Sequence, residues 1–504
     1  MFNVHKKQNY IVMKPIKQFF PVCLFGLLLL LASCKKWLDV NPTTQVKEGV
    51  QFSSKQGYTD ALFGIYQNAA KTSGYGRNLT FGLLDILAQR YENKTLSTSL
   101  YYKLAHYNYK DADVKALTDA VFTNVYGSVA QANYILKNID NSGSVLDETS
   151  RSIIKGEALG MRGFLHFDLA RLFSERYADG ANAGTTSIAY MKEFTVKPQT
   201  RLSLGAVLDL CEADLKAAEV LLSVNQSIDQ ISGNQGSTSA DLFLQFRQNH
   251  LNYWAVKATL ARLYLFKGDK VNALKYASDV INSQKFSFVV PSALNVDATA
   301  LTSDLTFSSE HVFSIYVSGL KVVADDVFKN TTPTGEVSDL WSTRTKLDAM
   351  FQASLVGYGT DIRRPGASKN LWSEVTTAIV YTKKYWSDNA SNVKQRIIPV
   401  IRLAELYYIA AECAPTMDEG IGYLNTVRVN RLIPALAVPA TREAFENEIL
   451  LEYRKEFYAE GQLWFYFKRK NMVNIPDGAA NPMVKDNYIF PLPDAELEFG
   501  TSGN

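Results

Sequence analysis

The sequence contains little histidine and little cysteine, which limits the metal chemistry open to it. Its 504 residues include five histidines and four cysteines. No two histidines lie at metal-ligand spacing, and no cysteine pair has the spacing of a zinc site or of a disulfide framework. The sequence therefore predicts neither a metal nor a cofactor.

Catalytic motifs and a charge bias are also missing. The chain has no glycine-rich phosphate loop, no Gly-x-Ser-x-Gly elbow and no His-Glu-x-x-His pair. Its 53 basic and 50 acidic residues leave a formal net charge of +3, which is not the large excess of positive charge that nucleic-acid binding would indicate. We therefore expect a protein that binds no nucleic acid, is not an enzyme and has no catalytic residues.

A long apolar run is absent after residue 34, whereas a short one precedes it. Lys14 and Lys17 come before an apolar stretch, 19–32, that has the length of a secretory signal and is too short to span a bilayer. Leu31-Ala32-Ser33-Cys34 then resembles the lipobox of bacterial lipoproteins, in which the thiol receives a diacylglycerol. We expect cleavage before Cys34, with an ordinary secretion signal and an incidental cysteine as the alternative.

Residues 1–33 are thus interpreted as a signal peptide and 34–49 as a lipidated tether. Residues 1–12 are polar, which is unusual upstream of such a leader and suggests Met13 as the true start. Burying acyl chains contributes about 0.8 kcal/mol per methylene, so two or more chains anchor a protein stably. We expect a globular body, 50–504, that is held on a membrane by lipid.

Helical patterns fill most of this body. Apolar residues recur every three or four positions over 117–139 and 154–172, so these segments can pack as an antiparallel pair. The pair at 250–283 resembles a tetratricopeptide unit, with Gly268-Asp269 as the tight turn between its helices. Further helical stripes occur at 203–222, 250–267, 270–283, 400–413, 417–430 and 442–460. Side chains assigned to packing include Cys211, Cys413, His166, Trp254 and Trp464.

Three stretches interrupt the helices. Residues 71–112 are rich in Gly, Tyr, Asn, Ser and Thr, 223–240 form a polar linker, and 284–396 contain β-like runs such as 286–290. Because loops on a rigid scaffold commonly carry binding sites, we expect function there. We predict a single mainly α-helical domain of tetratricopeptide-like pairs, with long loop-rich insertions and a few short strands. Its predicted parts are 50–283, the loop-rich insertion 284–396, and 397–504.

Charged residues at helical spacing occur near the C-terminus. Arg402 and Glu405 are three positions apart, and Glu452 and Glu456 flank Arg454. This spacing predicts ion-pair networks between helices. Paired carboxylates also serve glycosidases as acid and base, so a lipid-anchored glycan hydrolase is an alternative.

Short motifs along the chain resemble one known family. The run 35–42 gives an aromatic, Leu-Asp and a proline after the lipobox, and 125–136 and 156–173 resemble two long family helices. The C-terminal third adds Pro399, Arg402-Leu403-Ala404-Glu405, Tyr407, Ala411-Glu412, Leu424-Asn425, Val427-Arg428, Arg431, Glu452, Arg454, Glu456-Phe457, Glu460-Gly461, Phe490-Pro491, Pro493 and Glu496-Leu497. In this order the motifs resemble the SusD/RagB outer-membrane nutrient-binding lipoproteins of Bacteroidetes. The chain departs at Gly163, commonly alanine, and at 462–469, which leaves the ligand class open among glycans and peptides.

The resemblance implies a lipid-anchored scaffold on the outer membrane, exposed at the cell surface. It also implies that the scaffold acts as the lid of a SusC-like TonB-dependent transporter and delivers a nutrient to it. Family members commonly bind glycans on aromatic platforms, because a ring face suits the C–H face of a sugar. We therefore predict ligand-binding roles for aromatics in inserted segments and one polar neighbour, namely Tyr75, Arg90, Tyr91, Trp341, Trp372 and Trp386. The alternatives are ring packing for each residue, and a protein-binding scaffold for the whole chain.

Overall fold

The computed structural model describes residues 48–92, 95–228, 241–330 and 339–502. Met13, Cys34, the predicted signal peptide and most of the predicted tether lie outside these ranges. The chain divides into two compact units, Met1–Gln51 and Phe52–Asn504. In the first unit the structure describes one short helix, α2 (Glu48–Gln51), and all other described elements belong to the second.

The second unit is mainly helical, as predicted. Its α-helices are α3 (Lys55–Ala69), α4 (Leu83–Leu87), α5 (Leu100–Ala105), α6 (Ala112–Ile139), α7 (Glu148–Phe173), α8 (Leu204–Leu222), α9 (Tyr253–Lys267), α10 (Lys270–Asn282), α11 (Leu320–Phe328), α12 (Arg344–Met350), α13 (Leu403–Cys413), α14 (Met417–Asn430), α15 (Arg442–Glu456), α16 (Gln462–Lys470) and α17 (Asp494–Phe499). Short 3-10 turns lie between them, including η5 (Ser308–Glu310).

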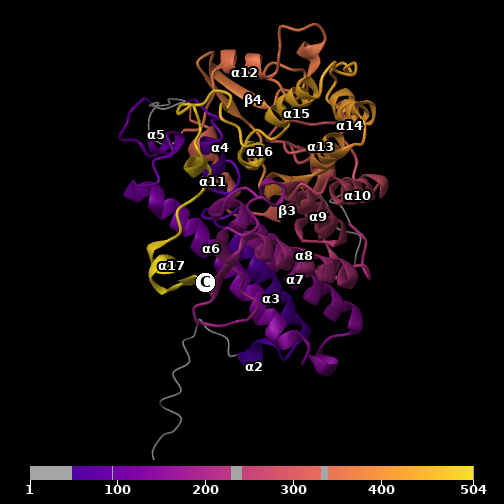
Figure 1. Ribbon diagram of the computed structural model, residues 1–504. Coiled ribbons are helices and arrows are strands. Elements are labelled where there is room, and N and C mark those ends of the chain that lie inside the picture. Colours follow the sequence, from indigo (N-terminus) through magenta and orange to yellow (C-terminus); the bar gives the residue numbers. More distant parts are fainter. Residues whose placement is uncertain (1–47, 93–94, 229–240, 331–338, 503–504) are drawn as a thin grey trace, which may run out of the picture. The chain divides into compact units, whose positions relative to one another are not determined.

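The long helices form a continuous stack of antiparallel pairs. Each member contacts the next in the order α3, α6, α7, α8, α9, α10, α13 and α14, and Figure 1 shows this succession within the unit. The tetratricopeptide-like unit is confirmed, since Gly268 ends α9 with a φ of +80° and Asp269 caps α10. The stack passes directly from α10 to α13, although residues 283–402 lie between them in the sequence.

Side chains of the sequence explain where these helices begin and how closely they approach. Asp147 accepts a hydrogen bond from the Ser150 amide at 2.8 Å and so caps α7. The middle of α7 lies against α8 at a glycine, because a methyl group on Gly163 would stand 3.0 Å from the Cys211 carbonyl oxygen. Small residues at this contact therefore set the spacing of the two helices.

Three small sheets accompany the helices. Their strands are β1 (Thr186–Ala189), β2 (Thr200–Ser203) and β7 (Thr501–Ser502) in the first, β3 (His311–Tyr316) and β6 (Ile397–Arg402) in the second, and β4 (Trp372–Thr376) and β5 (Ile379–Thr382) in the third. The antiparallel β3–β6 pair sets His311 opposite Arg402. Strand β6 follows the insertion and leads directly into α13.

Two local predictions are wrong. The run 286–290 is not a strand, because its amides bond elsewhere: the Ser287 amide donates to the Ser309 carbonyl and the Val289 amide to the Glu310 carboxylate. The stripe at 400–413 is helical only from Leu403, since 397–402 pair with β3 instead. The boundaries predicted at 283/284 and 396/397 remain predictions.

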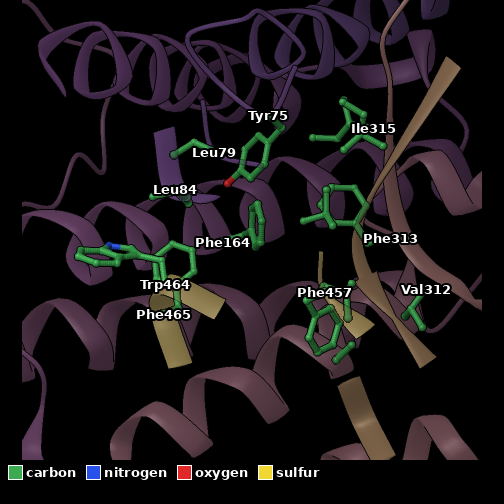
Figure 2. Packing of buried hydrophobic residues seen from close by; sticks show 14 of the residues in the cluster. Tyr75, Leu79, Leu84, Phe164, Val312, Phe313, Ile315, Phe457, Trp464 and Phe465 are labelled. Carbon is green, nitrogen blue, oxygen red and sulfur yellow. The ribbon is translucent and has the colours of Figure 1, made fainter. Parts of the chain in front are cut away.

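The core extends through the whole second unit and includes the residues that we assigned to packing. Trp464 is completely buried, Cys211 and Cys413 are buried free thiols, and Trp254 and His166 are buried on their helices. Figure 2 shows Tyr75 beside Phe164, whose ring in turn meets Phe313 edge-on at a centroid distance of 5.5 Å. Residues from α7, β3 and the 71–112 segment therefore share one core.

Candidate functional site

A groove of about 650 Å³ lies along the segment 72–104 and is completed by residues of α6 and α11. Its lining alternates apolar side chains, such as Leu83 and Leu100, with the polar groups of Arg77, Asn78 and Asp326. This volume falls within the range of roughly 300–1,000 Å³ that small-molecule sites occupy. Among the described cavities it is the one in which the 71–112 stretch, where we expected function, supplies most of the wall.

Two glycines shape the near wall of the groove. The chain turns back on the end of α3, and the amides of Gly74 and Gly76 both donate to the Lys71 carbonyl, at 2.8 and 3.1 Å. A methyl group on Gly74 would lie 2.4 Å from the Ala69 carbonyl oxygen, and one on Gly76 would lie 2.2 Å from that of Ala70. Only glycine permits this approach, which brings Arg77 and Asn78 to the groove.

The lining of the groove contains a guanidinium, an amide, a phenol and a carboxylate. The Arg77 guanidinium donates a hydrogen bond to the Tyr101 hydroxyl. Burial raises the pKa of Tyr101, an effect that the neighbouring Arg77 partly offsets and Asp326 reinforces. A guanidinium, an amide and a carboxylate provide both donors and acceptors for the hydroxyl groups of a ligand. The arrangement can thus bind a neutral polyhydroxylated molecule, whose apolar faces would rest on the leucines.

The residues predicted to bind ligand are not in this groove. Tyr75 is 3% exposed, and its hydroxyl donates to Asp168 at 2.5 Å. Trp386 is half-buried, its indole N–H donates to the Phe328 carbonyl at 3.1 Å, and Lys329 lies over its ring. Their contact with a ligand remains a prediction.

The other four predicted residues are buried, and three of them surround Tyr458. The ring of Tyr458 lies 5.6 Å from Tyr91 and 4.8 Å from Trp372, and the guanidinium of Arg90 lies 5.0 Å from its centroid. Exposed fractions are 3% for Arg90, 4% for Tyr91, 4% for Trp372 and 9% for Trp341. Protein atoms therefore cover these four side chains in this conformation.

The sequence interpretation missed the side chains that do line the groove. Arg77, Asn78 and Tyr101 lie within the 71–112 stretch that we singled out, so its composition was the available signal. Asp326 comes from α11, and nothing in the sequence indicates that it lies opposite residues 225 to 249 positions earlier.

A buried charge network contains the acids considered for catalysis. We define it as Glu310, Asp361, Arg363, Lys384, Arg402, Arg428, Arg431, Glu452, Lys455, Glu456 and Glu460, which are joined by ion pairs. Burial would raise the pKa of Glu452, but Arg363, Lys455 and Arg428 lower it to about 2. The predicted ion-pair network is confirmed.

The partners within the network differ from those suggested by spacing. Arg402 bonds Glu456 and Glu460 instead of Glu405, which pairs with Arg262 at 2.6 Å. Arg454, which lies between Glu452 and Glu456 in the sequence, forms its ion pair with Asp477, at 2.9 Å. The side chains of Glu452 and Glu456 are fully buried and held by cations, so they are not placed to act on a glycan.

The described parts of the chain contain no cluster of three or more His, Cys, Asp or Glu side chains that could bind a metal. None of the described helices combines the length and apolar character needed to cross a bilayer.

Two family profiles match the chain. One is described as starch-binding associating with outer membrane and covers residues 36–265, which include most of the groove lining. The other describes the SusD family and covers residues 323–498. No functionally curated protein resembles the chain significantly.

Solved structures share the fold at low sequence identity. A SusD superfamily protein from Bacteroides thetaiotaomicron has 14% identity and a TM-score of 0.69, over 89% of this chain and 97% of that one. A SusD-like carbohydrate binding protein from Bacteroides vulgatus has 17% identity and a TM-score of 0.65, over 89% and 96% of the two chains. Because the profiles match both halves of a fold that these structures share, the chain belongs to the SusD/RagB family.

Proposed function

We propose that the protein binds a glycan in the groove between the 72–104 segment and α11. The observation that carries this proposal is the lining, in which Arg77, Asn78 and Asp326 stand among leucines. Sugars require both kinds of surface, since their hydroxyls need directed hydrogen bonds and their C–H faces need apolar contact. The starch-binding description of the matching profile, and the carbohydrate-binding name of a structural neighbour, support this ligand class.

The protein is a cell-surface lipoprotein in this proposal, attached to the outer membrane through Cys34. It delivers its ligand to a SusC-like TonB-dependent transporter and serves as the lid of that barrel. The lipobox supports the anchor, and membership of the SusD/RagB family supports the partner. Purification from its own membrane without a co-purifying barrel protein would contradict the transporter role.

Catalysis is not part of the proposal. The paired acids that favoured a glycan hydrolase lie within the buried charge network, so the observation behind that alternative no longer supports it. Release of reducing ends from a polysaccharide would revive the hydrolase. A protein-binding scaffold is distinguished by the absence of any glycan or peptide that raises the Tm.

Binding is tested by titration calorimetry with maltoheptaose, followed by oligosaccharides of plant and host glycans and by peptides. Asp326→Asn and Arg77→Ala are expected to weaken binding by about tenfold each, as for loss of a charge-assisted hydrogen bond. Asp325→Asn is the matched control, because Asp325 is adjacent on α11, pairs with Lys321 and does not line the groove. Equal losses for Asp325→Asn and Asp326→Asn would locate the site elsewhere, as would binding that only Trp386→Ala impairs.

A further inference from the structure

The short helix α4 has one face on the groove and another in the core. Leu83 and Ile86, three positions apart on the helix, both line the groove. Leu84 belongs to the apolar core that Figure 2 shows, and Asp85 is completely buried without lining the groove. A change at Asp85 would therefore act on a ligand in the groove mainly through the position of α4.

The carboxyl group of Asp85 fastens α4 to the turn between α15 and α16, residues 457–461. Its Oδ1 accepts a hydrogen bond from the Gly461 amide at 3.0 Å, although the two residues are 376 positions apart. Gly461 has a φ of +73°, and a methyl group added to it would stand 2.8 Å from the Leu79 carbonyl oxygen. The turn 457–461 therefore lies directly against the chain that leads into α4, and Asp85 bonds the helix to it.

A negative charge on Asp85 would have little compensation at this position. Among the described residues, its second oxygen, Oδ2, has no hydrogen-bond partner. Arg90 and Lys384 are cations that act on the carboxyl group, but both are engaged elsewhere. Arg90 donates to the Arg454 carbonyl at 2.5 Å. Lys384 forms its ion pair with Glu460, at 2.6 Å.

The surroundings of Asp85 favour its neutral form. Burial raises the pKa of Asp85 to about 7, although both cations and two backbone amides oppose this shift. Tyrosines face the carboxyl group as well, and burial, reinforced by the charge of Asp85, raises the pKa of each, so they stay neutral: Tyr91, Tyr385 and Tyr458. Burial also lowers the pKa of Lys384. Asp85 is thus a buried acid that titrates near neutral pH where α4 meets the turn.

Opening of α4 and release of this proton are linked. When α4 leaves the turn 457–461, water reaches Asp85 and its pKa returns towards the ordinary value of about 4. Between pH 4 and 7 the docked state therefore binds more protons than the open state. The contribution of the proton to docking is full below pH 4 and is lost as the pH rises through 7, so acid favours docking.

We propose that Asp85 is a positioning residue of the groove: its neutral carboxyl group docks α4 on the turn 457–461, and loss of the proton favours movement of the helix away from it. The inference rests on the proposed function, because docked α4 is what presents Leu83 and Ile86 to a glycan. The groove is accordingly firmest in mild acid and loosens as the pH rises.

Hydrogen–deuterium exchange of the α4 amides, corrected for the intrinsic rate, tests the docking on the purified chain. Between pH 6 and 8 the opening constant of α4 is expected to rise about tenfold, as linkage requires for a pKa of about 7 when docked and about 4 when open. Asp85→Asn, a neutral isostere that can still accept from Gly461, is expected to lack this rise and to open less than the wild type at pH 8. The amides of α10, which packs on α9 and α13, are the internal control.

Titration calorimetry with maltoheptaose, or with the first oligosaccharide of the series that binds, connects docking to the groove. At pH 6 Asp85→Asn is expected to keep its affinity, whereas Asp85→Ala removes the acceptor for the Gly461 amide and should weaken binding about fivefold. Asp326→Asn, in the lining itself, should weaken binding without changing α4 exchange.

The two measurements fail separately. An opening constant that does not change with pH, equal rises in the wild type and Asp85→Asn, or full affinity in Asp85→Ala despite faster α4 exchange would overturn the role of Asp85. The exchange profile of the wild type needs neither a variant nor a ligand. A chain that binds no glycan would therefore sink the proposed function, while exchange still decides whether Asp85 docks α4.

Discussion

Arg431, which directly follows α14, and Glu310 of η5 are 121 residues apart and form a two-pronged ion pair, with Nη1–Oε1 and Nη2–Oε2 distances of 2.7 and 2.6 Å. Both side chains are fully buried. The pair connects the loop-rich insertion with the C-terminal helices. The insertion is therefore joined to the scaffold by charge as well as by apolar packing.

Removing one partner of this pair is expected to be costly. Glu310→Gln leaves Arg431 short of a countercharge in the core and should lower the free energy of unfolding by about 3–5 kcal/mol. The double variant Glu310→Gln, Arg431→Met should cost less than the sum of the two single changes. Urea denaturation of all four proteins measures this coupling. Glu446→Gln, which breaks the exposed pair with Arg442, is the control and should change stability by less than about 1 kcal/mol.

The turn of the tetratricopeptide-like unit depends on Gly268. Gly268→Ala is expected to lower the free energy of unfolding by about 1–2 kcal/mol, because φ is +80° there and a methyl group would lie 2.0 Å from Oδ1 of Asp179. Gly422→Ala, in the middle of α14 with no atom within 4 Å of the added methyl, should instead stabilise by about 0.5–1 kcal/mol. Thermal unfolding of both variants checks the two signs. A stabilised Gly268→Ala variant would contradict this account of the turn.

Two buried histidines are expected to destabilise the protein in acid, at a pH well above the pKa of about 2 that ion pairs give a core carboxylate such as Glu452. Burial lowers the pKa of His166 and of His311 to about 4, from 6.5 in an unfolded chain. At these two sites the unfolded state binds more protons between pH 4 and 6.5, so their contribution to stability is full above pH 6.5 and is lost as the pH drops towards 4. Burial raises the pKa of Asp85 to about 7, which opposes this loss, because the folded state holds a proton more tightly at that carboxyl. The loss is about 3 kcal/mol for each histidine.

Urea midpoints measured from pH 7.5 to 4 test this dependence. His166→Gln should be less stable overall but should lose less stability across the same pH window, because one of the two groups is gone. An unchanged slope in this variant would mean that His166 does not titrate as its burial predicts.

The lipidation that we propose at Cys34 gives a prediction for the intact cell. Cys34→Ala should prevent acylation and move the protein from the membrane fraction to the soluble fraction, as judged by immunoblotting and by mass spectrometry of the amino terminus. Cys23→Ala is the matched control, because Cys23 lies in the apolar leader and should be removed with it. Equal membrane association of both variants would show that Cys34 is not the anchor.

Amphipathic spacing predicted most of the helical stack, and its failures have physical causes. Residues 462–468 of α16 are buried on all sides, so the helix has no polar face that would outline a stripe. The apolar face of α3 is interrupted by Gly57 and Gly64. A methyl group on Gly64 would lie 3.2 Å from Oε1 of Gln131 on α6, so this glycine permits a close helix contact that single-sequence patterns do not reveal.

The candidate site was located by region but not by residue. Composition marked 71–112 as a stretch that interrupts the helices, and we expected its aromatics Tyr75 and Tyr91 to bind the ligand. The segment instead folds inward, so that Tyr75 and Tyr91 enter the core while Arg77 and Asn78 face the groove. Sequence alone does not distinguish these outcomes, because both depend on distant partners such as Asp168 and Phe328.

The contact between α10 and α13 has a consequence for how the chain matures. Because synthesis proceeds from the N-terminus, α10 must wait for more than a hundred further residues before α13, one of the two helices that it contacts, exists. The apolar face of α10 that α13 covers in the folded protein is thus uncovered on the nascent polypeptide during that interval. A chaperone that binds apolar segments would cover this face until α13 has been made.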